Sequence, residues 1–379
     1  MIKRTAQKII EESLYKGKVI TIYGARRVGK TTLSKAILES QRAAGKRVNY
    51  LNCESSNVKN RLETTNELQL KDFLGDYELV VLDEAQNIER VGHILKLLVD
   101  TYPDIQIIAT GSSSFELSNQ VGEPLVGRGR EFKLLPFSTG ELAADMGMID
   151  LSGRLESLLR FGSYPTVFGV SETDAKEELN DIAGKYLYKD ILAFENLRNS
   201  DLLLDLLKLI ALQVGNEVSL HEIGTILGLA GTTVKRYIDL LEKCFIIFRL
   251  PALSRNLRKE IAKSRKIYFY DLGIRNALIQ NFNTLDIRND VGALWENFCI
   301  VERMKRNEIR RFRPNTYFWR LYSGPEVDYI EEHGGRLDGF EFKYGTTGKF
   351  RPPRRFIETY ENSTVNLVNP DNWYEFTLK

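Results

Sequence analysis

The sequence has few of the residues on which several protein classes depend. Its 379 residues include three cysteines, and Cys53, Cys244 and Cys299 are far apart and odd in number. This pattern argues against a disulfide framework and a cysteine zinc site, and three histidines are too few for a histidine metal cage. No apolar run approaches the roughly 18–20 residues that cross a bilayer, and the opening MIKRTAQKIIEESLYKGK is too polar for a signal peptide. We therefore expect a cytoplasmic protein without a membrane segment.

The composition also lacks any strong overall bias. Hydrophobic residues make up 43% of the chain and charged residues 27%, which excludes disordered, collagen-like and rod-like classes. The net charge of +2 hides an uneven distribution, because residues 54–89 carry nine acidic and three basic side chains. Residues 251–270 and 301–320 together carry thirteen basic and three acidic ones. These basic stretches are either solvated faces or a surface that meets a polyanion.

The order of predicted elements indicates an α/β fold with three domains. Residues 1–145 alternate short apolar strands with helices, which is typical of a parallel sheet covered on both faces. The strands are expected at 18–23, 47–51, 78–82 and 105–110, and the helices at 30–44 and 93–100. Residues 146–252 are predicted to be helical and to end in a winged helix, and residues 253–379 mix strands with helices.

The winged-helix prediction depends on residues 216–250. Ser219 and Glu222 have the spacing of a capping box for a helix that ends at Gly228. A second helix is predicted over 232–243 and a strand over 245–250, which completes a helix-turn-helix and wing pattern. Lys235 and Arg236 lie early in the second helix, where DNA contacts fall in such modules. Winged helices also bind protein partners, so both interpretations stay open.

The strongest motif is a glycine-rich loop that follows the first strand and opens the first long helix, in the pattern of a P-loop. It consists of Gly24, Ala25, Arg26, Arg27, Val28, Gly29, Lys30, Thr31 and Thr32. Glycines allow backbone N–H groups to surround phosphates, and the helix N-terminus adds its positive dipole end. Lys30 is predicted to reach the β- and γ-phosphates and Thr31 to bind Mg²⁺. The motif therefore predicts ATP and Mg²⁺ as cofactors.

Two further strand ends support this prediction. The strand at 78–82 leads into Asp83 and Glu84. We expect Asp83 to hold the Mg²⁺ shell and Glu84 to act as general base toward the attacking water, which favours ATP hydrolysis. The strand at 105–110 ends in Thr110 and continues to Ser112, and either side chain is a candidate for contact with the γ-phosphate.

Arginines in a later glycine-containing loop are candidates for catalysis between subunits. Arg128 and Arg130 lie in the segment LVGRGR, and Arg128 is predicted to act as an arginine finger toward a neighbouring subunit of a homo-oligomer. Arginines in glycine loops are also common as plain surface residues.

The ordered set of motifs resembles prokaryotic AAA-type P-loop ATPases, often called archaeal-type ATPases. The resemblance is carried by GARRVGKTT, VVLDEAQN, ATGSSSFEL, LVGRGREFKLLPFS, YLYKDIL, YFYDLGIRNAL, WENF, EVDYI and EFKYG. It implies ATP binding and hydrolysis, a central winged helix, and a C-terminal α/β domain related to restriction-endonuclease-like folds. It does not supply a substrate.

The C-terminal residues 326–343 are predicted to form a β-hairpin with a turn at Gly334 and Gly335. In this register Asp328 faces Glu341, and carboxylates so placed repel each other unless a cation or a proton lies between them. The layout is that of a PD-(D/E)xK nuclease, in which Asp328 and Glu341 would bind Mg²⁺ and Lys343 would act on the water.

Glu296, in the helix that contains WENF, would complete this nuclease set. A charged outer face on an ordinary amphipathic hairpin is the alternative. Three functions follow from the sequence: an ATPase that couples nucleotide state to DNA, an ATP-dependent switch that binds a protein through a vestigial nuclease fold, and an ATP-gated nuclease that uses Mg²⁺.

Overall fold

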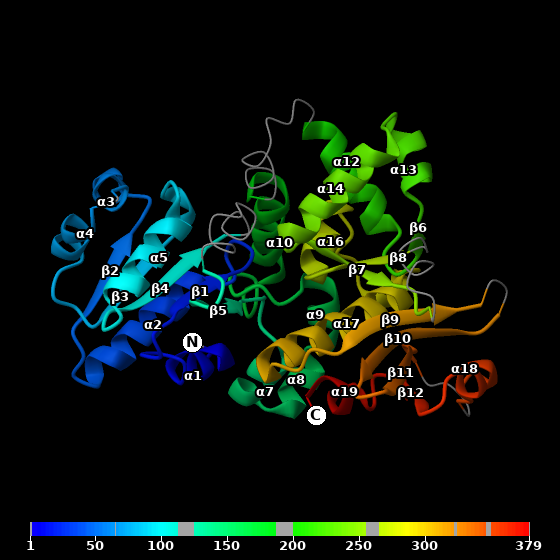
Figure 1. Ribbon diagram of the computed structural model, residues 1–379. Helices are drawn as coiled ribbons and strands as arrows, with labels where there is room; N and C mark the ends of the chain where they lie inside the picture. Colours follow the sequence, from blue (N-terminus) through cyan, green and yellow to red (C-terminus); the bar gives the residue numbers. More distant parts are fainter. Residues whose placement is uncertain are drawn as a thin grey trace. The chain divides into compact units, whose positions relative to one another are not determined.

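The computed structural model describes residues 2–64, 66–112, 125–186, 200–254, 265–321, 324–345 and 350–378. The chain forms two compact units. Unit 1 contains Met1–Phe137 and Lys243–Phe245, and unit 2 contains Ser138–Glu242 and Ile246–Lys379. Figure 1 follows the chain through these units from blue to red. Among the described residues, no helix has both the length and the apolar character needed to cross a membrane.

Unit 1 is built on a five-stranded parallel sheet in the order β2-β3-β4-β1-β5. Its strands are β1 (Val19–Tyr23), β2 (Val48–Asn52), β3 (Leu79–Asp83), β4 (Gln106–Gly111) and β5 (Gly129–Lys133). The prediction of a parallel sheet is confirmed, and the four predicted strands lie within one residue of their expected bounds. The fifth strand was not predicted, because its sequence GREFK is charged and only partly buried at the edge of the sheet.

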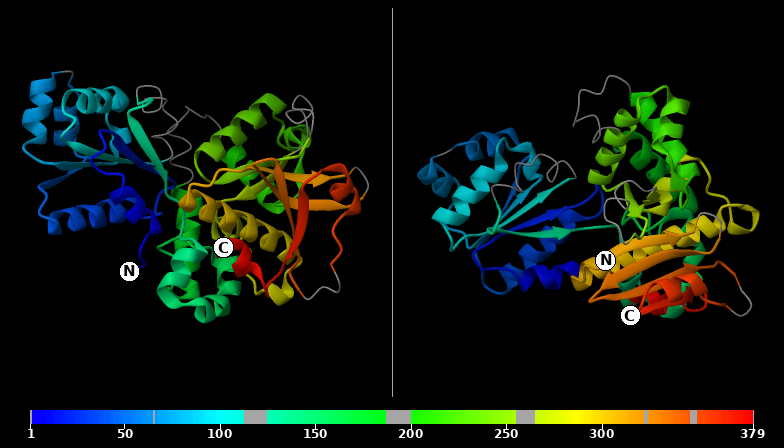
Figure 2. Two further views of the ribbon diagram at one scale, coloured as in Figure 1. Left: turned by 60° about the horizontal axis from the view of Figure 1, so that its bottom comes forward. Right: turned by 45° about the vertical axis from the view of Figure 1, so that its right-hand side comes forward.

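Helices cover both faces of this sheet. They are α1 (Thr5–Glu11), α2 (Lys30–Ala43), α3 (Ser56–Leu62), α4 (Glu67–Leu74), the short 3₁₀ turn η1 (Ala85–Asn87) and α5 (Val91–Thr101). Figures 1 and 2 show α2 on one face and α5 on the other. Buried apolar side chains of α4, α5, β3 and β4 form one continuous core, which holds the carboxyl ends of β1, β3 and β4 at one edge of the sheet.

Unit 2 begins with α7, whose first turn is closed by a capping box between Ser138 and Glu141. Its first helical part contains α7 (Thr139–Met146), α8 (Met148–Gly153), α9 (Leu155–Phe161), α10 (Glu172–Asp181), the π-helical turn η2 (Ile182–Tyr186) and α12 (Ser200–Leu212). The predicted helical character of this region holds for the described residues. The motif YLYKDIL lies almost entirely outside them.

A helix-turn-helix and a small sheet follow. Ser219 accepts the N–H of Glu222 at the start of α13 (Leu220–Leu227), and Gly228 ends that helix in a left-handed conformation. The second helix is α14 (Gly231–Lys243), so both predicted helices are confirmed. The strands β6 (Glu217–Val218), β7 (Ile247–Pro251) and β8 (Arg265–Phe269) form an antiparallel sheet in the order β6-β8-β7. This sheet contains strands from both sides of residue 252, where the sequence analysis placed a domain boundary.

The rest of unit 2 packs helices against a four-stranded sheet in the order β12-β11-β10-β9. Its elements are α16 (Leu272–Leu278), η3 (Leu285–Ile287), α17 (Val291–Arg310), β9 (Asn315–Arg320), β10 (Glu326–His333), β11 (Arg336–Phe342), α18 (Arg354–Thr359), β12 (Ser363–Val368) and α19 (Trp373–Leu378). The predicted hairpin register is confirmed from Tyr329 opposite Phe340 to His333 opposite Arg336. Gly334 and Gly335 both have positive φ, as a two-residue hairpin turn of this type requires.

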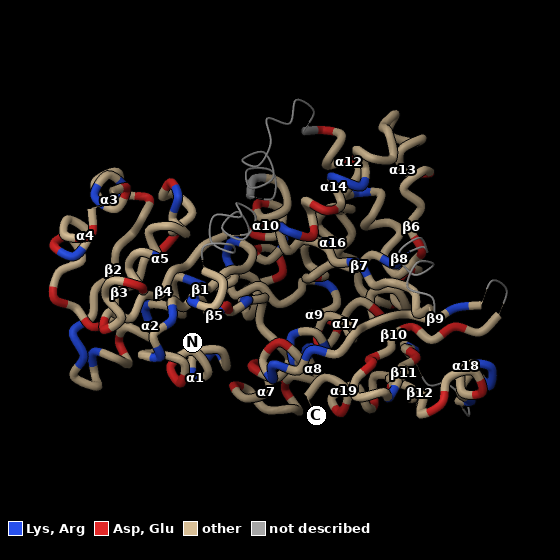
Figure 3. Tube along the Cα trace, in the orientation of Figure 1, with Lys and Arg blue, Asp and Glu red and all other residues tan. Residues whose placement is uncertain are grey.

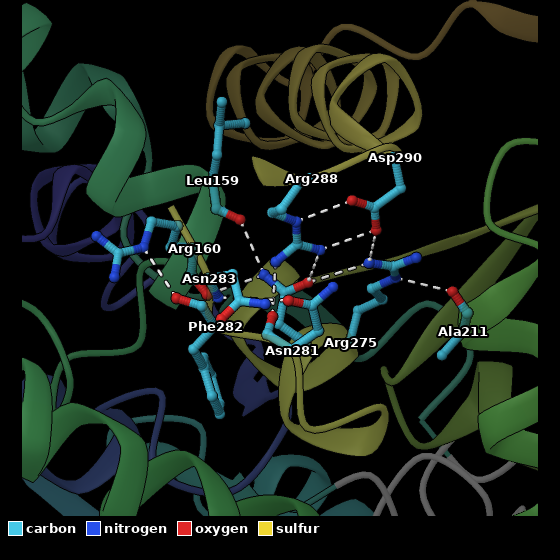
Figure 4. A network of polar contacts seen from close by, with 10 residues as sticks. Leu159, Arg160, Ala211, Arg275, Asn281, Phe282, Asn283, Arg288 and Asp290 are labelled. Atoms are coloured by element: carbon cyan, nitrogen blue, oxygen red, sulfur yellow. Dashed lines mark hydrogen bonds and ion pairs between the residues drawn. The ribbon is translucent and has the colours of Figure 1, made fainter. Parts of the chain in front are cut away.

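A buried ionic network ties several helices of unit 2 together (Figure 4). Asp290, just before α17, accepts from Arg275 Nη1 at 2.5 Å and from Arg288 Nε and Nη2 at 2.8 Å each. Arg275 also donates to the carbonyl of Ala211 in α12 at 2.8 Å. Both arginines donate to the side-chain oxygen of Asn276 in α16. The network therefore fixes α12, α16 and the start of α17 relative to one another.

The local surplus of basic residues in the sequence does not measure the charge that faces solvent. Lys266, Arg303 and Lys305 all belong to the two basic stretches, yet Lys266 and Lys305 are buried, and all three pair with carboxylates of unit 2. Residues 255–264 of the first stretch lie outside the described residues. Figure 3 shows basic and acidic residues interspersed over unit 2. The carboxylates that neutralise such groups come partly from distant segments, which a local count misses.

Candidate functional site

The loop from Gly24 to Gly29 has a backbone that requires its glycines. A Cβ atom on Gly24 would lie 2.0 Å from the carbonyl oxygen of Leu134. Gly29 precedes α2 with a φ of 93°, in the left-handed region that glycine adopts without strain. Arg27 also has a positive φ of 64°. The loop therefore curls over the N-terminus of α2, where the first N–H groups of a helix are open to an anion.

Lys30 lies inside this loop and is almost completely buried. Its Nζ donates to the carbonyl oxygens of Gly24 at 2.9 Å and Ala25 at 3.0 Å. The loop itself therefore holds the ammonium group at the place where phosphate oxygens would be received.

Asp83, at the end of β3, accepts hydrogen bonds from three hydroxyl groups. Thr31 Oγ1 and the Tyr50 hydroxyl donate to Oδ2 at 2.8 and 2.5 Å, and Thr110 Oγ1 donates to Oδ1. The predicted residues Thr31, Asp83 and Thr110 are thus brought together. The structure adds Tyr50, which the sequence analysis missed. Because β2 and β3 are neighbours, the two-residue period of the strand places Tyr50 on the same face as Asp83.

Burial, helped by the negative charge of Asp83, raises the pKa of Tyr50 well above its ordinary value. Burial likewise raises the pKa of the Cys53 thiol to about 12, with Asp83 and Glu84 adding to the effect. At neutral pH the phenol therefore stays protonated and acts as a donor, and the thiol stays neutral.

Glu84 has an unusual backbone for a side chain that is not glycine. Its φ of 54° and ψ of 43° are left-handed, a conformation that costs energy and is found at functional sites. Its N–H donates to Thr110 Oγ1 at 3.1 Å, and its carboxylate accepts from the amide of Gln86. The Thr110 hydroxyl therefore links the two acidic residues, since it donates to Asp83 and accepts from Glu84. Ser112, the other candidate after β4, is buried.

This link gives a testable prediction for Thr110. Replacing it with valine keeps the shape but removes the Thr110 donor to Asp83 Oδ1 and the acceptor of the Glu84 N–H, while Thr31 and Tyr50 still donate to Asp83 Oδ2. The lost bonds cost about 1–3 kcal/mol. We expect Thr110→Val to lower kcat for ATP hydrolysis about tenfold while ATP binding is retained, as measured by phosphate release and nucleotide titration.

Thr21→Val is the matched control. Thr21 lies on the neighbouring strand β1, is buried, and its hydroxyl has no hydrogen-bond partner among the described residues. Its loss should leave turnover unchanged. Equal turnover in the Thr110 and Thr21 variants would show that the Thr110 hydroxyl does not position the acidic pair.

The oxygen atoms at Thr31 and Asp83 fit a magnesium ion. The hydroxyl and carboxylate oxygens lie 2.8 Å apart, and Mg²⁺ prefers hard oxygen ligands of this kind together with waters and phosphates. Thr31 would bind the ion, and Asp83 would hold its water shell.

Arg128 lies directly before β5, and Arg130 lies within it. Arg128 Nε is 2.6 Å from Asp100 Oδ1, in an ion pair whose two side chains are each 43% exposed. The Arg130 guanidinium lies 5.9 Å from the centre of the Phe132 ring. Any reach of Arg128 toward another subunit would first have to open its ion pair with Asp100.

The C-terminal carboxylates also come together, within unit 2. Asp328 is buried, and burial raises its pKa well above the ordinary value, with the charges of Glu296 and Glu341 adding to the effect. Its Oδ2 accepts the N–H of Phe342 at 2.8 Å. Lys343 Nζ lies 2.9 Å from Glu341 Oε1. The four residues predicted from the sequence therefore form one cluster.

Lys266 lies in the middle of this cluster and was not predicted. Its Nζ is 3.0 Å from Glu296 Oε1, bonds to Glu326, and is 3.9 Å from Asp328 Oδ1. Tyr268, two residues along β8, donates its hydroxyl to Glu296 at 2.5 Å. The sequence did contain a signal for this lysine, because it begins the otherwise apolar segment KIYFY. Its carboxylate partners, however, are on distant segments.

The cluster does not fit the divalent metal that Asp328 and Glu341 were predicted to bind. No group of three or more Asp, Glu, His or Cys side chains in the described part of the chain is arranged to hold a metal ion. The predicted hairpin register holds from Tyr329 to His333, and the ammonium of Lys266 lies 3.9 Å from Asp328 Oδ1.

Lys235 and Arg236, the predicted DNA contacts, are exposed on α14. The opposite side of this helix is buried and includes Val234, Tyr237 and Ile238. The helix thus packs by one side and presents its basic side to solvent.

Comparison with known families identifies the first part of the chain. Residues 16–143 match the family model of an AAA domain, and together with the parallel sheet and the phosphate loop this match shows that unit 1 carries an AAA-type P-loop ATPase domain. Residues 152–285 match a domain of unknown function (DUF8612), and residues 291–372 match another (DUF4143). Neither description names an activity.

Individual proteins add little to this assignment. An uncharacterized protein of Mycobacterium tuberculosis is 26% identical over 374 residues, which cover 97% of this chain and 80% of that protein. DnaA from Aquifex aeolicus bound to AMPPCP is 20% identical over 63% of this chain and 86% of that one, with a TM-score of 0.30. The Aeropyrum pernix ORC1 protein in complex with DNA is 15% identical over 74% of this chain and 93% of that one, with a TM-score of 0.34. Scores this low carry no argument about function.

Proposed function

We propose that the protein hydrolyses ATP at the loop of residues 24–32 and couples its nucleotide state to DNA binding through α13 and α14. The observation that carries the first part is the chain of hydrogen bonds from Thr31 through Asp83 and Thr110 to Glu84. This chain connects the phosphate loop to two adjacent carboxylates in different environments. Asp83 is buried and accepts from three hydroxyl groups, whereas Glu84 is half-buried.

The residues of the site have different roles in hydrolysis. The N–H groups at the start of α2 and the Lys30 ammonium bind the phosphates and offset charge on the leaving oxygen. Thr31 and the water shell at Asp83 would hold Mg²⁺, which would add positive charge beside the phosphates. Glu84 accepts a proton from the attacking water, and Gln86 orients its carboxylate.

The second part of the proposal rests on the helix-turn-helix. Three residues separate α13 from α14, the spacing of modules that place their second helix in a DNA groove. Lys235 and Arg236 are exposed on that second helix. The direct test is the ATPase rate of the full chain with and without single- and double-stranded DNA, where stimulation by DNA is expected.

Removing the two basic residues should weaken DNA binding in a salt-dependent way. The double variant Lys235→Ala and Arg236→Ala loses two phosphate contacts, so the slope of log K against log salt should fall by about 2. Fluorescence anisotropy of a labelled duplex over a range of salt concentrations measures this slope. ATP binding should not change.

The control removes the same charge elsewhere. Lys96 on α5 and Arg154 before α9 are both exposed, and their replacement by alanine should leave the slope close to that of the wild type. An unchanged slope in the Lys235 and Arg236 variant would remove α14 from the DNA interface.

A protein partner is the second candidate. It is favoured by the internal neutralisation of Lys266, Arg303 and Lys305, because these charges are not available to a polyanion. Failure of the wild-type protein to bind DNA even at low salt would make an ATP-dependent switch on a protein partner the leading function. In either case Arg128 remains our candidate for an arginine finger in a homo-oligomer, since its ion pair with Asp100 is solvent-accessible and can open.

A further inference from the structure

The carboxylate cluster of unit 2 contains a cation of its own. Lys266 extends from β8 toward Glu296 on α17 and toward Glu326 and Asp328 on β10. Its side chain is 3% exposed, so the ammonium has lost nearly all of its hydration. Burying a charged group in this way is costly unless opposite charges and hydrogen-bond acceptors compensate it, and here the compensating groups are carboxylates.

Some oxygen atoms of the cluster also accept hydrogen bonds from other groups of the chain. Glu296 also accepts the Tyr268 hydroxyl, and Asp328 also accepts the N–H of Phe342. Phe318 covers Lys266, with its ring centre 5.4 Å from Nζ.

The two oxygen atoms of Glu341 lie in different surroundings. Its Oε1 pairs with Lys343, while its Oε2 is buried and has no hydrogen-bond partner among the described residues. A divalent ion takes about six oxygen ligands, and a second cation beside the Lys266 ammonium would be repelled.

We infer that the Lys266 ammonium is the resident cation of this cluster and that unit 2 therefore works without a divalent metal. Cleavage of phosphodiesters by a metal-held water is then absent from this domain. The ion pairs of Lys266 instead hold β8, α17 and the hairpin together. This inference concerns unit 2 alone and is independent of the ATPase proposed for unit 1.

The test uses thermal unfolding of the full chain without nucleotide, in EDTA and in millimolar Mn²⁺. All three tryptophans, Trp295, Trp319 and Trp373, belong to unit 2, so their fluorescence follows that unit and not the phosphate loop. The wild type is expected to melt at the same temperature in both solutions. A rise in Mn²⁺ that is abolished by Asp328→Asn would overturn the inference.

The second arm removes the resident cation. Lys266→Met leaves the carboxylates without their counterion, so unit 2 should melt at a lower temperature in EDTA. Mn²⁺ supplied from solution should then raise the melting temperature by about 5 °C or more. Adding Asp328→Asn to Lys266→Met should remove this recovery.

Lys343→Met is the matched control. Lys343 touches the same cluster, but its side chain is 50% exposed and, within the described part of the chain, forms its ion pair with Glu341, so its loss should create no dependence on Mn²⁺. If Lys266→Met folds and Mn²⁺ does not restore its stability, the ammonium does not occupy a cation site and the inference fails. If that variant does not fold, the inference is tested by the melting temperatures of the wild type and Asp328→Asn in EDTA and in Mn²⁺.

Discussion

The Glu84→Gln variant is expected to bind ATP as tightly as the wild type and to hydrolyse it at least about 100-fold more slowly. The substitution keeps the size of the side chain and its contact with Gln86, but an amide cannot accept the proton of the attacking water. The phosphate loop and the Asp83 network do not involve the Glu84 carboxylate, so binding should be retained. A fluorescent ATP analogue measures binding, and phosphate release under saturating ATP measures turnover.

Two other variants serve as comparisons, one that should lose ATP binding and one that should behave like the wild type. Lys30→Ala should lose ATP binding itself, because it removes the ammonium that the loop holds for the phosphates. Glu89→Gln changes an exposed carboxylate a few residues beyond Glu84 and should leave both binding and turnover unchanged. Turnover by Glu84→Gln at the wild-type rate would exclude Glu84 as the general base.

The parts of the site that the sequence predicted depend on residues close together in the chain or at the ends of parallel strands. The phosphate loop is one continuous motif, and Asp83 and Thr110 end neighbouring strands whose carboxyl ends share one edge of the sheet. The hairpin register followed from the turn at Gly334 and Gly335. In each case a local pattern fixes which side chains meet.

The parts that were missed depend on the partners of a residue across the fold. Tyr50 reaches Asp83 because β2 pairs with β3, and the order of strands in the sheet could not be read from either strand. Lys266 meets Glu296 and Glu326, which are 30 and 60 residues away along the chain. A charged residue in an apolar strand signals a buried partner, but the sequence does not say which one.

Asp290→Asn is expected to destabilise unit 2 by about 3–5 kcal/mol, because it removes one partner of a buried ionic network. Arg275 and Arg288 are buried, and both bond to the Asp290 carboxylate. Burial lowers the pKa of Arg275, which Asp290 partly offsets, so the buried guanidinium depends on this carboxylate to compensate its lost hydration. Denaturant unfolding followed by tryptophan fluorescence reports on unit 2, which contains every tryptophan of the chain.

Asp205→Asn is the control for this prediction. Asp205 forms an ion pair with Lys208 on the surface of α12, with both side chains 54% exposed, and exposed pairs contribute about 0–1 kcal/mol. Its loss should therefore leave the unfolding midpoint nearly unchanged. An Asp290 variant as stable as the Asp205 variant would mean that the two buried arginines do not need their shared carboxylate.

The same network sets a pH dependence whose sign follows from the pKa of Asp290. Burial acts to raise this pKa, but the hydrogen bonds and charges of Arg288 and Arg275 lower it from 3.8 to about 2. A carboxyl group whose pKa is lower in the folded state stabilises that state above its ordinary pKa, and the contribution is lost as the pH falls toward the folded value. Unit 2 of the wild type should therefore lose stability between about pH 4 and pH 2. Asp290→Asn, which has no carboxyl group to titrate here, should show a smaller loss over that interval, and equal slopes in the two proteins would contradict the assignment of this titration to Asp290.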